Sequence, residues 1–318
     1  MMKNAAPEPK NKPYNDYSSY VLKLFGCRVQ KISIHAGFSC PNRDGTKGYG
    51  GCSYCLNESF SPFYCHQDKP VEQQLDEGIA FFARKYKAMR YLVYFQTYTN
   101  TYADVEDLGI LYRKMLNHDK VLGLIVATRP DCIDAEILSL LAGLSNKHYI
   151  AIELGVESTL DRTLQRINRH HTYGQSADAI KLARQFNIPC GIHLIMGLPG
   201  ETVSDMTDHA VKISELPVNS LKIHQLQVLK GTPIAHEFET KSTYFHHFDV
   251  DDYIDLCIDM LERLNPAIII ERFISESPVD LVIHPQWGKI KNFEFVSRLE
   301  KRMYERKTYQ GKLFCATS

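Results

Sequence analysis

Short apolar segments alternate with amphipathic ones along about the first 230 residues of the chain. The apolar segments are rich in Val and Ile and are as long as strands buried on both faces of a parallel sheet. The segments between them carry apolar residues at helical spacing, as in Val71, Leu75, Ile79, Phe82 and Tyr86. From this pattern we predict strands at 29–35, 91–96, 122–128, 149–156, 189–197 and 220–229.

Six strand–helix units in this order predict an α/β fold whose sheet is parallel and whose crossovers are right-handed. A closed or partly closed barrel fits the pattern, and so does an open, doubly wound sheet.

The pattern changes after Leu229, and Gly231-Thr232-Pro233 marks the break. A helix at 250–264, a strand around 268–274 and a helix at about 293–307 follow. We therefore predict three parts, which are a loose N-terminal tail over 1–14, a core domain over 15–234 and a smaller C-terminal extension packed on it over 235–318.

Composition excludes several classes of protein. Hydrophobic residues make up 44% of the chain and charged residues 23%, which is ordinary for a globular protein and argues against general disorder. No apolar run reaches the length of roughly 18 residues that spans a bilayer, so we expect no membrane partner. The polar first 14 residues lack the apolar core of a signal peptide, and we expect a cytoplasmic location.

The net charge of zero hides an uneven distribution. Residues 1–48 and residues 289–312 each hold eight Lys or Arg against three Asp or Glu. Basic ends suit contact with a polyanion such as nucleic acid, and they equally suit an ordinary solvated surface.

The cysteines carry the sharpest chemical signal. Nine cysteines are an odd number, and thiols stay reduced in the cytosol, so metal binding or catalysis is favoured over disulfides. Cys40, Cys52 and Cys55 form a C-x11-C-x2-C array just beyond the first predicted strand, in a loop with four glycines. Three thiolates at this spacing can bind three irons of a cubane cluster and leave the fourth iron open, whereas structural clusters use four cysteines. A zinc site completed by Cys65 or His66 is the alternative.

Polar motifs follow most of the predicted strands. Because ligands bind at the carboxyl ends of parallel strands, we expect these motifs to meet at one edge of the sheet. They are Gln96–Tyr102, Ala127–Asp131, Glu153–Ser158, His193–Glu201 and His224–Gln227.

Taken together, these motifs resemble those of radical S-adenosylmethionine (radical SAM) enzymes, and specifically of the bacterial YhcC/YtqA-like family. The loop from Cys40 to Cys55, with Tyr54 before the last cysteine, is similar to that family's long version of the cluster motif. Further stretches resemble the Elongator-type tRNA-modifying branch or extend the match, which covers about residues 20–300. They are Ala127–Asp131, Glu153–Ser158, Ile167–His171 and Met196–Glu201.

This resemblance implies a partial (βα)6 barrel of the TIM type. It implies one [4Fe–4S] cluster held by Cys40, Cys52 and Cys55, with SAM chelating the open iron. Reduction would cleave SAM to methionine and a 5′-deoxyadenosyl radical, which abstracts a hydrogen atom from the substrate. An electron donor such as flavodoxin or ferredoxin is expected as a partner.

The resemblance also implies residues that bind SAM. Arg169 matches a position that pairs with the SAM carboxylate, and Glu157 is placed to accept a hydrogen bond from the ribose or adenosine. Thr97, Tyr98 and Thr99 occupy the place of the usual glycine-rich motif that receives the ammonium group, although they lack its paired glycines. Thr128 and His193 complete the predicted set; at His193 many relatives have an acidic residue.

For the substrate, the family resemblance implies tRNA, at the C5 side chain of the wobble uridine. The implied step shortens carboxymethylaminomethyl-uridine to aminomethyl-uridine. A radical SAM enzyme with another substrate and a zinc-containing RNA-binding protein without catalysis are the alternatives. The candidate substrate contacts are Arg129, His224, Gln225, Glu271, Arg272 and Trp287, of which Trp287 also fits a core position.

Overall fold

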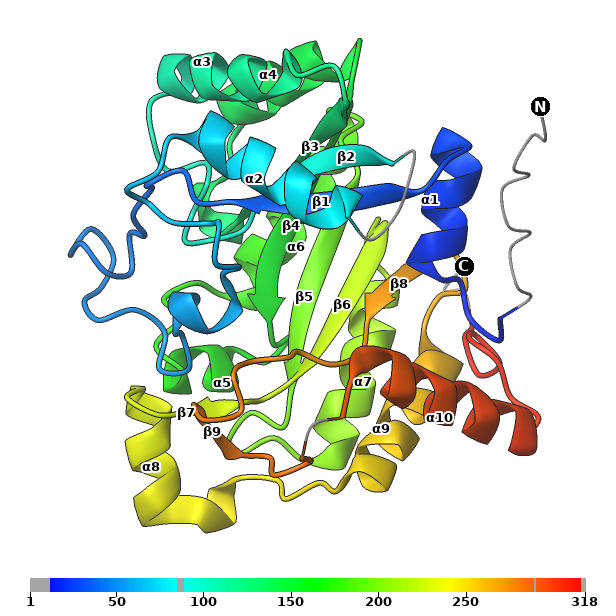
Figure 1. The fold of residues 1–318 in the computed structure, drawn as a ribbon. Helices are drawn as coiled ribbons and strands as arrows, with labels where there is room; N and C mark the ends of the chain where they lie inside the picture. Colours follow the sequence, from blue (N-terminus) through cyan, green and yellow to red (C-terminus); the bar gives the residue numbers. More distant parts are fainter. Residues whose placement is uncertain (1–11, 85–88, 289, 316–318) are drawn as a thin grey trace.

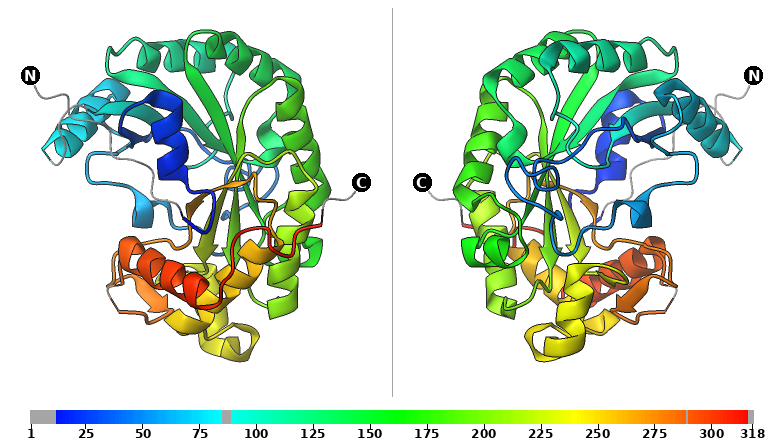
Figure 2. Two further views of the ribbon diagram at one scale, coloured as in Figure 1. Left: turned by 90° about the vertical axis from the view of Figure 1, so that its right-hand side faces the viewer. Right: turned by 90° about the vertical axis from the view of Figure 1, so that its left-hand side faces the viewer.

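The computed structural model describes residues 12–84, 89–288 and 290–315. Its centre is a sheet of seven parallel strands in the order β1-β2-β3-β4-β5-β6-β8, curled into a half-barrel (Figures 1 and 2). The strands are β1 (Val29–Ile34), β2 (Arg90–Phe95), β3 (Val121–Thr128), β4 (Tyr149–Glu157), β5 (Cys190–Met196), β6 (Ser220–Gln225) and β8 (Ile269–Arg272). The predicted α/β half-barrel is confirmed.

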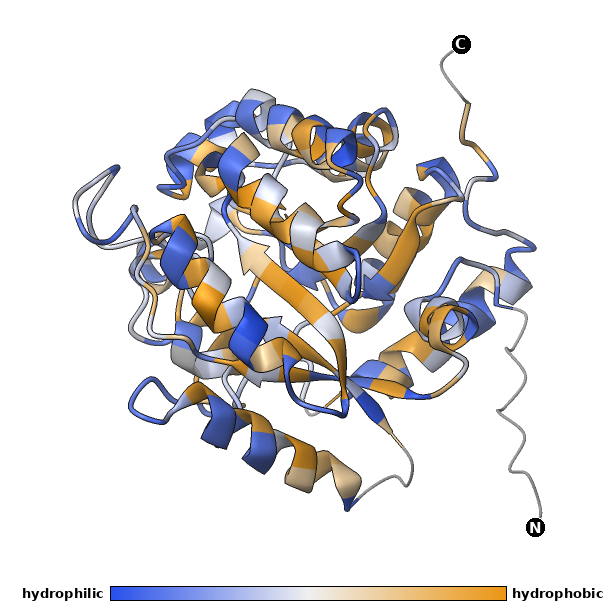
Figure 3. Cartoon of the chain, turned by 90° about the horizontal axis from the view of Figure 1, so that it is seen from above, coloured by the Kyte–Doolittle hydropathy of each residue, from blue (hydrophilic) through white to orange (hydrophobic). Residues whose placement is uncertain are grey.

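Most of the helices cover the outer face of this sheet, with their polar residues turned outward (Figures 2 and 3). The helices are α1 (Tyr17–Phe25), α2 (Val71–Ala83), α3 (Val105–Leu116), α4 (Ala135–Ser145), α5 (Asp161–Arg166), α6 (Tyr173–Gln185), α7 (Val203–Ser214), α8 (Pro233–Lys241), α9 (Val250–Arg263) and α10 (Asn292–Glu305). Among the described residues, no helix is long and apolar enough to cross a membrane.

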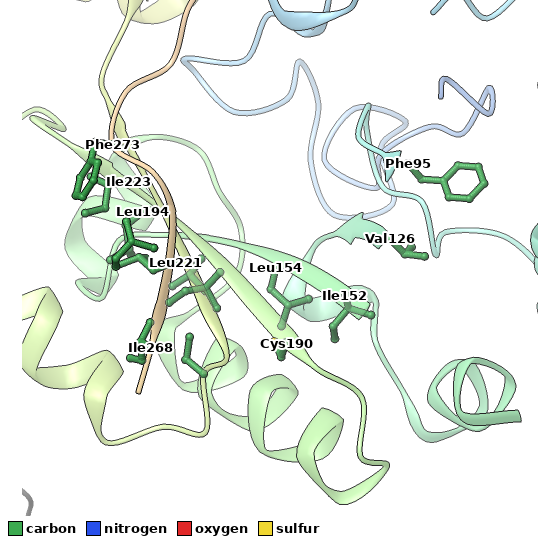
Figure 4. Close-up of a cluster of buried hydrophobic side chains, with 14 of the residues drawn as sticks. Phe95, Val126, Ile152, Leu154, Cys190, Leu194, Leu221, Ile223, Ile268 and Phe273 are labelled. Atoms are coloured by element: carbon green, nitrogen blue, oxygen red, sulfur yellow. The ribbon is translucent and has the colours of Figure 1, made fainter. Parts of the chain in front are cut away.

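The main hydrophobic core lies between the sheet and the helices, and it includes the strand side chains that point outward from the half-barrel (Figure 4). In β1, Ile32 and Ile34 are fully buried in this core, whereas the alternate residues Lys31 and Ser33 line an internal cavity. Since side chains alternate across a strand, an apolar outer face leaves the inner face of the half-barrel free for polar groups.

The predicted strand at 220–229 is wrong in its second half. It ends at Gln225, and after two residues Val228–Leu229 forms β7, which pairs antiparallel with β9 (Val282–His284) in a separate ribbon. Apolar residues recur through both strands, at Leu221, Ile223, Leu226, Val228 and Leu229, so the sequence pattern does not mark the change of sheet.

The seventh strand, β8, comes from the predicted C-terminal extension and lies beside β6 in the main sheet. Its far edge is covered by the segment before α1, where the Ile270 N–H donates to the backbone oxygen of Asn15 at 2.7 Å. Asp16 then caps α1 by accepting hydrogen bonds from the N–H groups of Ser18 and Ser19. The residues before α1 thus lie beside β8, the last strand of the half-barrel, and α1 leads from there to β1, the first strand.

The predicted loose tail over residues 1–14 falls largely outside the described residues, which begin at Lys12. Its last residue is packed rather than loose, because Tyr14 is 8% exposed and its hydroxyl donates to Glu300 at 3.1 Å.

Candidate cluster and cofactor site

A cavity of about 580 Å³ runs through the interior of the half-barrel to the carboxyl ends of its strands. Cys40, Cys52 and Cys55 all line it. The structure also brings together most of the predicted SAM-binding residues there, namely Tyr98, Thr99, Thr128, Glu157, Arg169 and His193. The predicted substrate contacts on its wall are Arg129, His224, Gln225, Glu271 and Arg272.

Two of the predicted site residues do not line the cavity. Thr97 is buried beside it. Trp287 packs against Tyr253 and Phe295, and its indole N–H donates to the backbone oxygen of Phe248 at 2.8 Å. Trp287 therefore has the core role that the sequence left open.

The loop that carries the cysteines is fixed at several points along the rim. The Lys47 ammonium group donates to Asp131 at 2.5 Å, and the Ser53 N–H donates to the backbone oxygen of Ile167 at 3.0 Å. A side chain at Gly48 would force its neighbours to shift, because a Cβ there would lie 2.6 Å from the side-chain oxygen of the fully buried Asn42. These contacts hold the loop against the segments that follow β3 and α5.

The three cysteines differ in their surroundings. Cys40 and Cys52 are buried, and Cys55 is half-buried. Cys52 Sγ accepts from Arg169 Nη1 at 3.3 Å and from Asn42 Nδ2 at 3.5 Å. Burial and the neighbouring Cys52 raise the pKa of the Cys55 thiol to about 11, although nearby arginines oppose this. Without a bound metal, this environment favours the neutral thiol of Cys55 at neutral pH.

Other cysteines do not extend this set. Cys65 lies in the main hydrophobic core, and His66 is exposed beside Asp68, so neither joins Cys40 in the zinc site that the spacing allowed. Within the described residues, no three Cys, His, Asp or Glu side chains converge as ligands of a single metal ion would.

Arg169 is buried between the cysteine loop and the end of β4. Its side chain contacts Glu157 Oε1 at 3.4 Å, and Glu157 has a φ of 68° at a bulge in β4. Gly155 makes room for both groups, because a Cβ there would lie 2.5 Å from Arg169 Nη2 and 2.5 Å from Glu157 Oε1. The predicted partners of SAM are thus fixed against each other by the bulge.

The segment from Thr97 to Thr99 has the backbone of a glycine-containing turn without any glycine. Tyr98 has a φ of 60°, in the left-handed region that glycine usually occupies. The hydroxyl groups of Thr97 and Thr99 are buried and have no hydrogen-bond partner among the described residues. Thr128, by contrast, is already bonded to the Thr101 hydroxyl at 2.6 Å.

A buried group of charges crosses the interior below the cysteines, and we call Lys31, Glu153, Lys222 and Glu271 the ionic layer. Glu153 accepts from Lys31 at 2.9 Å and from Lys222 at 2.5 Å, and Glu271 accepts from Lys31 at 2.5 Å. Burial lowers the pKa of Lys222 to about 8, although Glu153 opposes this effect. Sequence reasoning found only Glu271 of the four as a contact candidate, although charged residues inside apolar strands were a visible signal.

Two histidines stand above the ionic layer on neighbouring strands. His193 Nε2 lies 3.0 Å from Glu153 Oε2, and the His193 and His224 ring centroids are 5.3 Å apart. His224 Nδ1 is bonded to the Ser275 hydroxyl, whereas its Nε2 is buried without a partner among the described residues. Burial and the nearby cations keep the pKa of His224 well below its ordinary value, so its ring is neutral.

Comparison with known proteins agrees with this geometry. Residues 40–213 match the model of the radical SAM superfamily, and residues 218–305 match that of the radical SAM C-terminal domain. The chain belongs to the radical SAM superfamily. It is 34% identical over 303 residues to YtqA of Bacillus subtilis, which covers 95% of this chain and 93% of YtqA.

Two further comparisons complete the picture. YhcC of Escherichia coli is 34% identical over 274 residues, covering 86% of this chain and 87% of YhcC. The structure of Elp3 from the archaeon Methanocaldococcus infernus superposes with a TM-score of 0.67 at 14% identity, over 89% of this chain and 64% of that one. At this identity the likeness to Elp3 concerns the fold alone. Membership of the superfamily supports an enzyme with SAM-dependent radical chemistry and implies a [4Fe–4S] cluster.

Proposed function

We propose that Cys40, Cys52 and Cys55 hold a [4Fe–4S] cluster and that SAM binds at its open iron. The observation that carries this proposal is that all three cysteines line one cavity whose wall also holds two buried donors, Arg129 Nη1 and the Thr99 hydroxyl, that have no partner in the part of the chain the structure describes. Thiolate sulfur is the ligand that iron–sulfur clusters use, and unpaired buried donors fit a polar cofactor. When bound, the cluster and SAM would supply hydrogen-atom abstraction after one-electron reduction.

The residues of this chain would bind and orient SAM. The Thr99 hydroxyl, which has no hydrogen-bond partner among the described residues, can accept from its ammonium group, and Glu157 can accept from a ribose hydroxyl. Thr97 does not line the cavity and stays a prediction. Tyr98, Thr128 and His193 stay predictions as SAM contacts. The guanidinium carbon of Arg43 lies 5.7 Å from the centroid of the Tyr98 ring. Tyr98 therefore also supports the cysteine loop, through a cation–π contact.

We infer that the substrate is tRNA and that the C5 side chain of the wobble uridine is shortened from carboxymethylaminomethyl to aminomethyl. The support is the sequence resemblance to the Elongator-type branch, together with aromatic side chains beside the cavity. Phe60 lines the cavity and is 38% exposed, and the nearby Phe63 is 74% exposed. Exposed aromatic rings suit the stacking of unpaired bases in a tRNA loop.

The basic C-terminal end gives less support for tRNA than its sequence suggested. On α10, Arg302 lies within 3.4 Å of Asp251 and 2.8 Å of Asp255. Arg306, which directly follows α10, lies within 2.9 Å of Asp255 and 3.2 Å of Asp259. These pairs join α10 to α9, so part of the positive charge is neutralised within the protein. The flavodoxin or ferredoxin partner and the cytoplasmic location stay predictions.

Mass spectrometry of tRNA nucleosides from cells with and without the gene tests the substrate. We expect carboxymethylaminomethyl-uridine to accumulate at the expense of aminomethyl-uridine without the gene. Wild-type protein should restore the pattern, and Cys52→Ala should not. Unchanged wobble uridines would reject tRNA as the substrate. Anaerobic SAM cleavage by the purified protein, measured separately, would then show whether the radical chemistry stands without it.

A further inference from the structure

Two arginines lie side by side at the cysteine end of the cavity. Arg129 and Arg169 are 2% and 7% exposed, and Arg129 Nη2 donates to the backbone oxygen of Arg169 at 2.7 Å. Both line the cavity, but they differ in how many of their guanidinium nitrogens have hydrogen-bond partners within the protein.

Every nitrogen of the Arg169 guanidinium already has a partner within the protein. Nε donates to His171 at 2.9 Å, and Nη2 donates to the backbone oxygen of Gly155 at 2.5 Å. Nη1 donates to Cys52 Sγ at 3.3 Å. The guanidinium is therefore directed at a cysteine and held there from two sides.

The guanidinium of Arg129 is held equally firmly but retains one free nitrogen. Nε and Nη2 donate to the two carboxylate oxygens of Asp131 at 2.9 and 3.0 Å. Nη1 is buried and has no hydrogen-bond partner among the described residues. An unpaired charged donor inside a protein is costly, so a free N–H group on a cavity wall indicates a place for an acceptor.

We propose that Arg169 acts on the bound cluster through Cys52 and raises its reduction potential, while Arg129 provides the free N–H group for the SAM carboxylate. This inference rests on the proposed cluster and SAM but not on the tRNA substrate. Arg169 is then a positioning residue for the Cys52 sulfur. The family resemblance implied that Arg169 pairs with the SAM carboxylate, whereas its observed contacts support a role at the Cys52 sulfur.

The sign of the effect follows from charge. Reduction adds an electron to the cluster, and a cation that donates a hydrogen bond to a ligating sulfur stabilises the reduced form. Removal of the Arg169 charge should therefore shift the potential to more negative values. Removal of Arg129 should instead weaken SAM binding, because a charge-assisted hydrogen bond to the carboxylate is lost.

The test measures two quantities on anaerobically reconstituted protein. The midpoint potential of the cluster is measured by titration followed by electron paramagnetic resonance, and the SAM affinity by equilibrium dialysis. Arg169→Gln should shift the potential to more negative values and change the SAM Kd by less than about twofold. Arg129→Gln should leave the potential close to wild type and raise the Kd about tenfold or more.

Two further variants keep the test decisive. Arg169→Lys retains the positive charge and should give a smaller shift than Arg169→Gln, and it replaces that variant if the latter fails to assemble a cluster. Arg166→Gln removes a pair with Glu237 at the end of α5, three residues before Arg169, and should change neither quantity. An unchanged potential with a tenfold weaker SAM affinity in the Arg169 variants would overturn the proposal, and so would wild-type SAM affinity in Arg129→Gln.

Discussion

Asn168 fixes the cysteine loop, because its side-chain amide donates a hydrogen bond of 2.8 Å to the backbone oxygen of Gly51, which lies 117 residues earlier. Asn168 has a φ of 56°, a left-handed conformation that asparagine tolerates better than most residues. One residue of the loop after α5 thus holds the glycine that immediately precedes Cys52.

Asn168→Gly should loosen this loop without straining the backbone. Loss of the amide contacts should cost about 1–2 kcal/mol of stability, and the reconstituted variant should lose iron to a chelator faster than wild type. Asn187→Gly is the matched control, since Asn187 is exposed and has the same φ of 56°. Equal rates of iron loss in Asn168→Gly and wild type would show that this contact does not hold the cluster loop.

Gly155→Ala should disturb the SAM site while leaving the fold intact. The added Cβ would lie 2.5 Å from both Arg169 Nη2 and Glu157 Oε1, so one of these side chains must move. We expect weaker SAM binding in equilibrium dialysis. Gly143→Ala, where a Cβ meets open space within α4, should bind SAM normally and gain about 0.4–1 kcal/mol of stability. Wild-type SAM affinity in Gly155→Ala would contradict the placement of SAM beside Glu157.

Asp131 should make the free energy of unfolding depend on pH in the acid range. Burial opposes its ionisation, but hydrogen bonds from Arg129 and Lys47 lower its pKa from 3.8 to about 2. A lowered pKa stabilises the fold by about 2 kcal/mol above pH 4, and this contribution is lost as the pH falls through about 2.

The stability difference between wild type and Asp131→Asn should therefore be largest above pH 4 and shrink toward pH 2. Urea denaturation at pH 3 to 7 measures it. Glu239→Gln, at a site with a 66% exposed side chain, should show no such dependence. A pH-independent difference for Asp131→Asn would reject the lowered pKa.

Glu153→Gln should destabilise the protein strongly, because it leaves Lys31 and Lys222 without their shared carboxylate in a buried layer. Breaking a buried ion pair from one side costs about 3–5 kcal/mol. The double variant Glu153→Gln/Lys222→Met removes one uncompensated charge and should recover part of this loss. Urea denaturation at pH 7 measures both, and a loss below about 1 kcal/mol would show that the ionic layer is not a structural element.

Much of the fold could be predicted from local pattern. The first six strands were found because Val- and Ile-rich segments alternate with helical ones, and this pattern is a property of neighbouring residues. The membership of β8 in the main sheet could not be found in this way. Its four residues Ile269–Arg272 carry no mark of their partner β6, which lies more than forty residues earlier.

The site shows the same division. The cysteine loop could be singled out from its spacing, because three cysteines within sixteen residues form a local motif. The contact between Arg169 and Cys52 joins residues 117 positions apart, and the ionic layer joins four strands. Such contacts follow from how the sheet curls, and a single sequence does not encode them at any fixed spacing.

The central claim is that Cys40, Cys52 and Cys55 together hold an iron–sulfur cluster. Iron and sulfide analysis with visible absorption, under argon after reconstitution, tests it most directly on wild type, Cys52→Ala and Cys257→Ala, whose cysteine is fully buried in the core. We predict about four irons per chain in wild type and Cys257→Ala, and loss of the chromophore in Cys52→Ala. Equal iron in all three proteins, or a colourless wild type that binds a single zinc ion, would contradict the account.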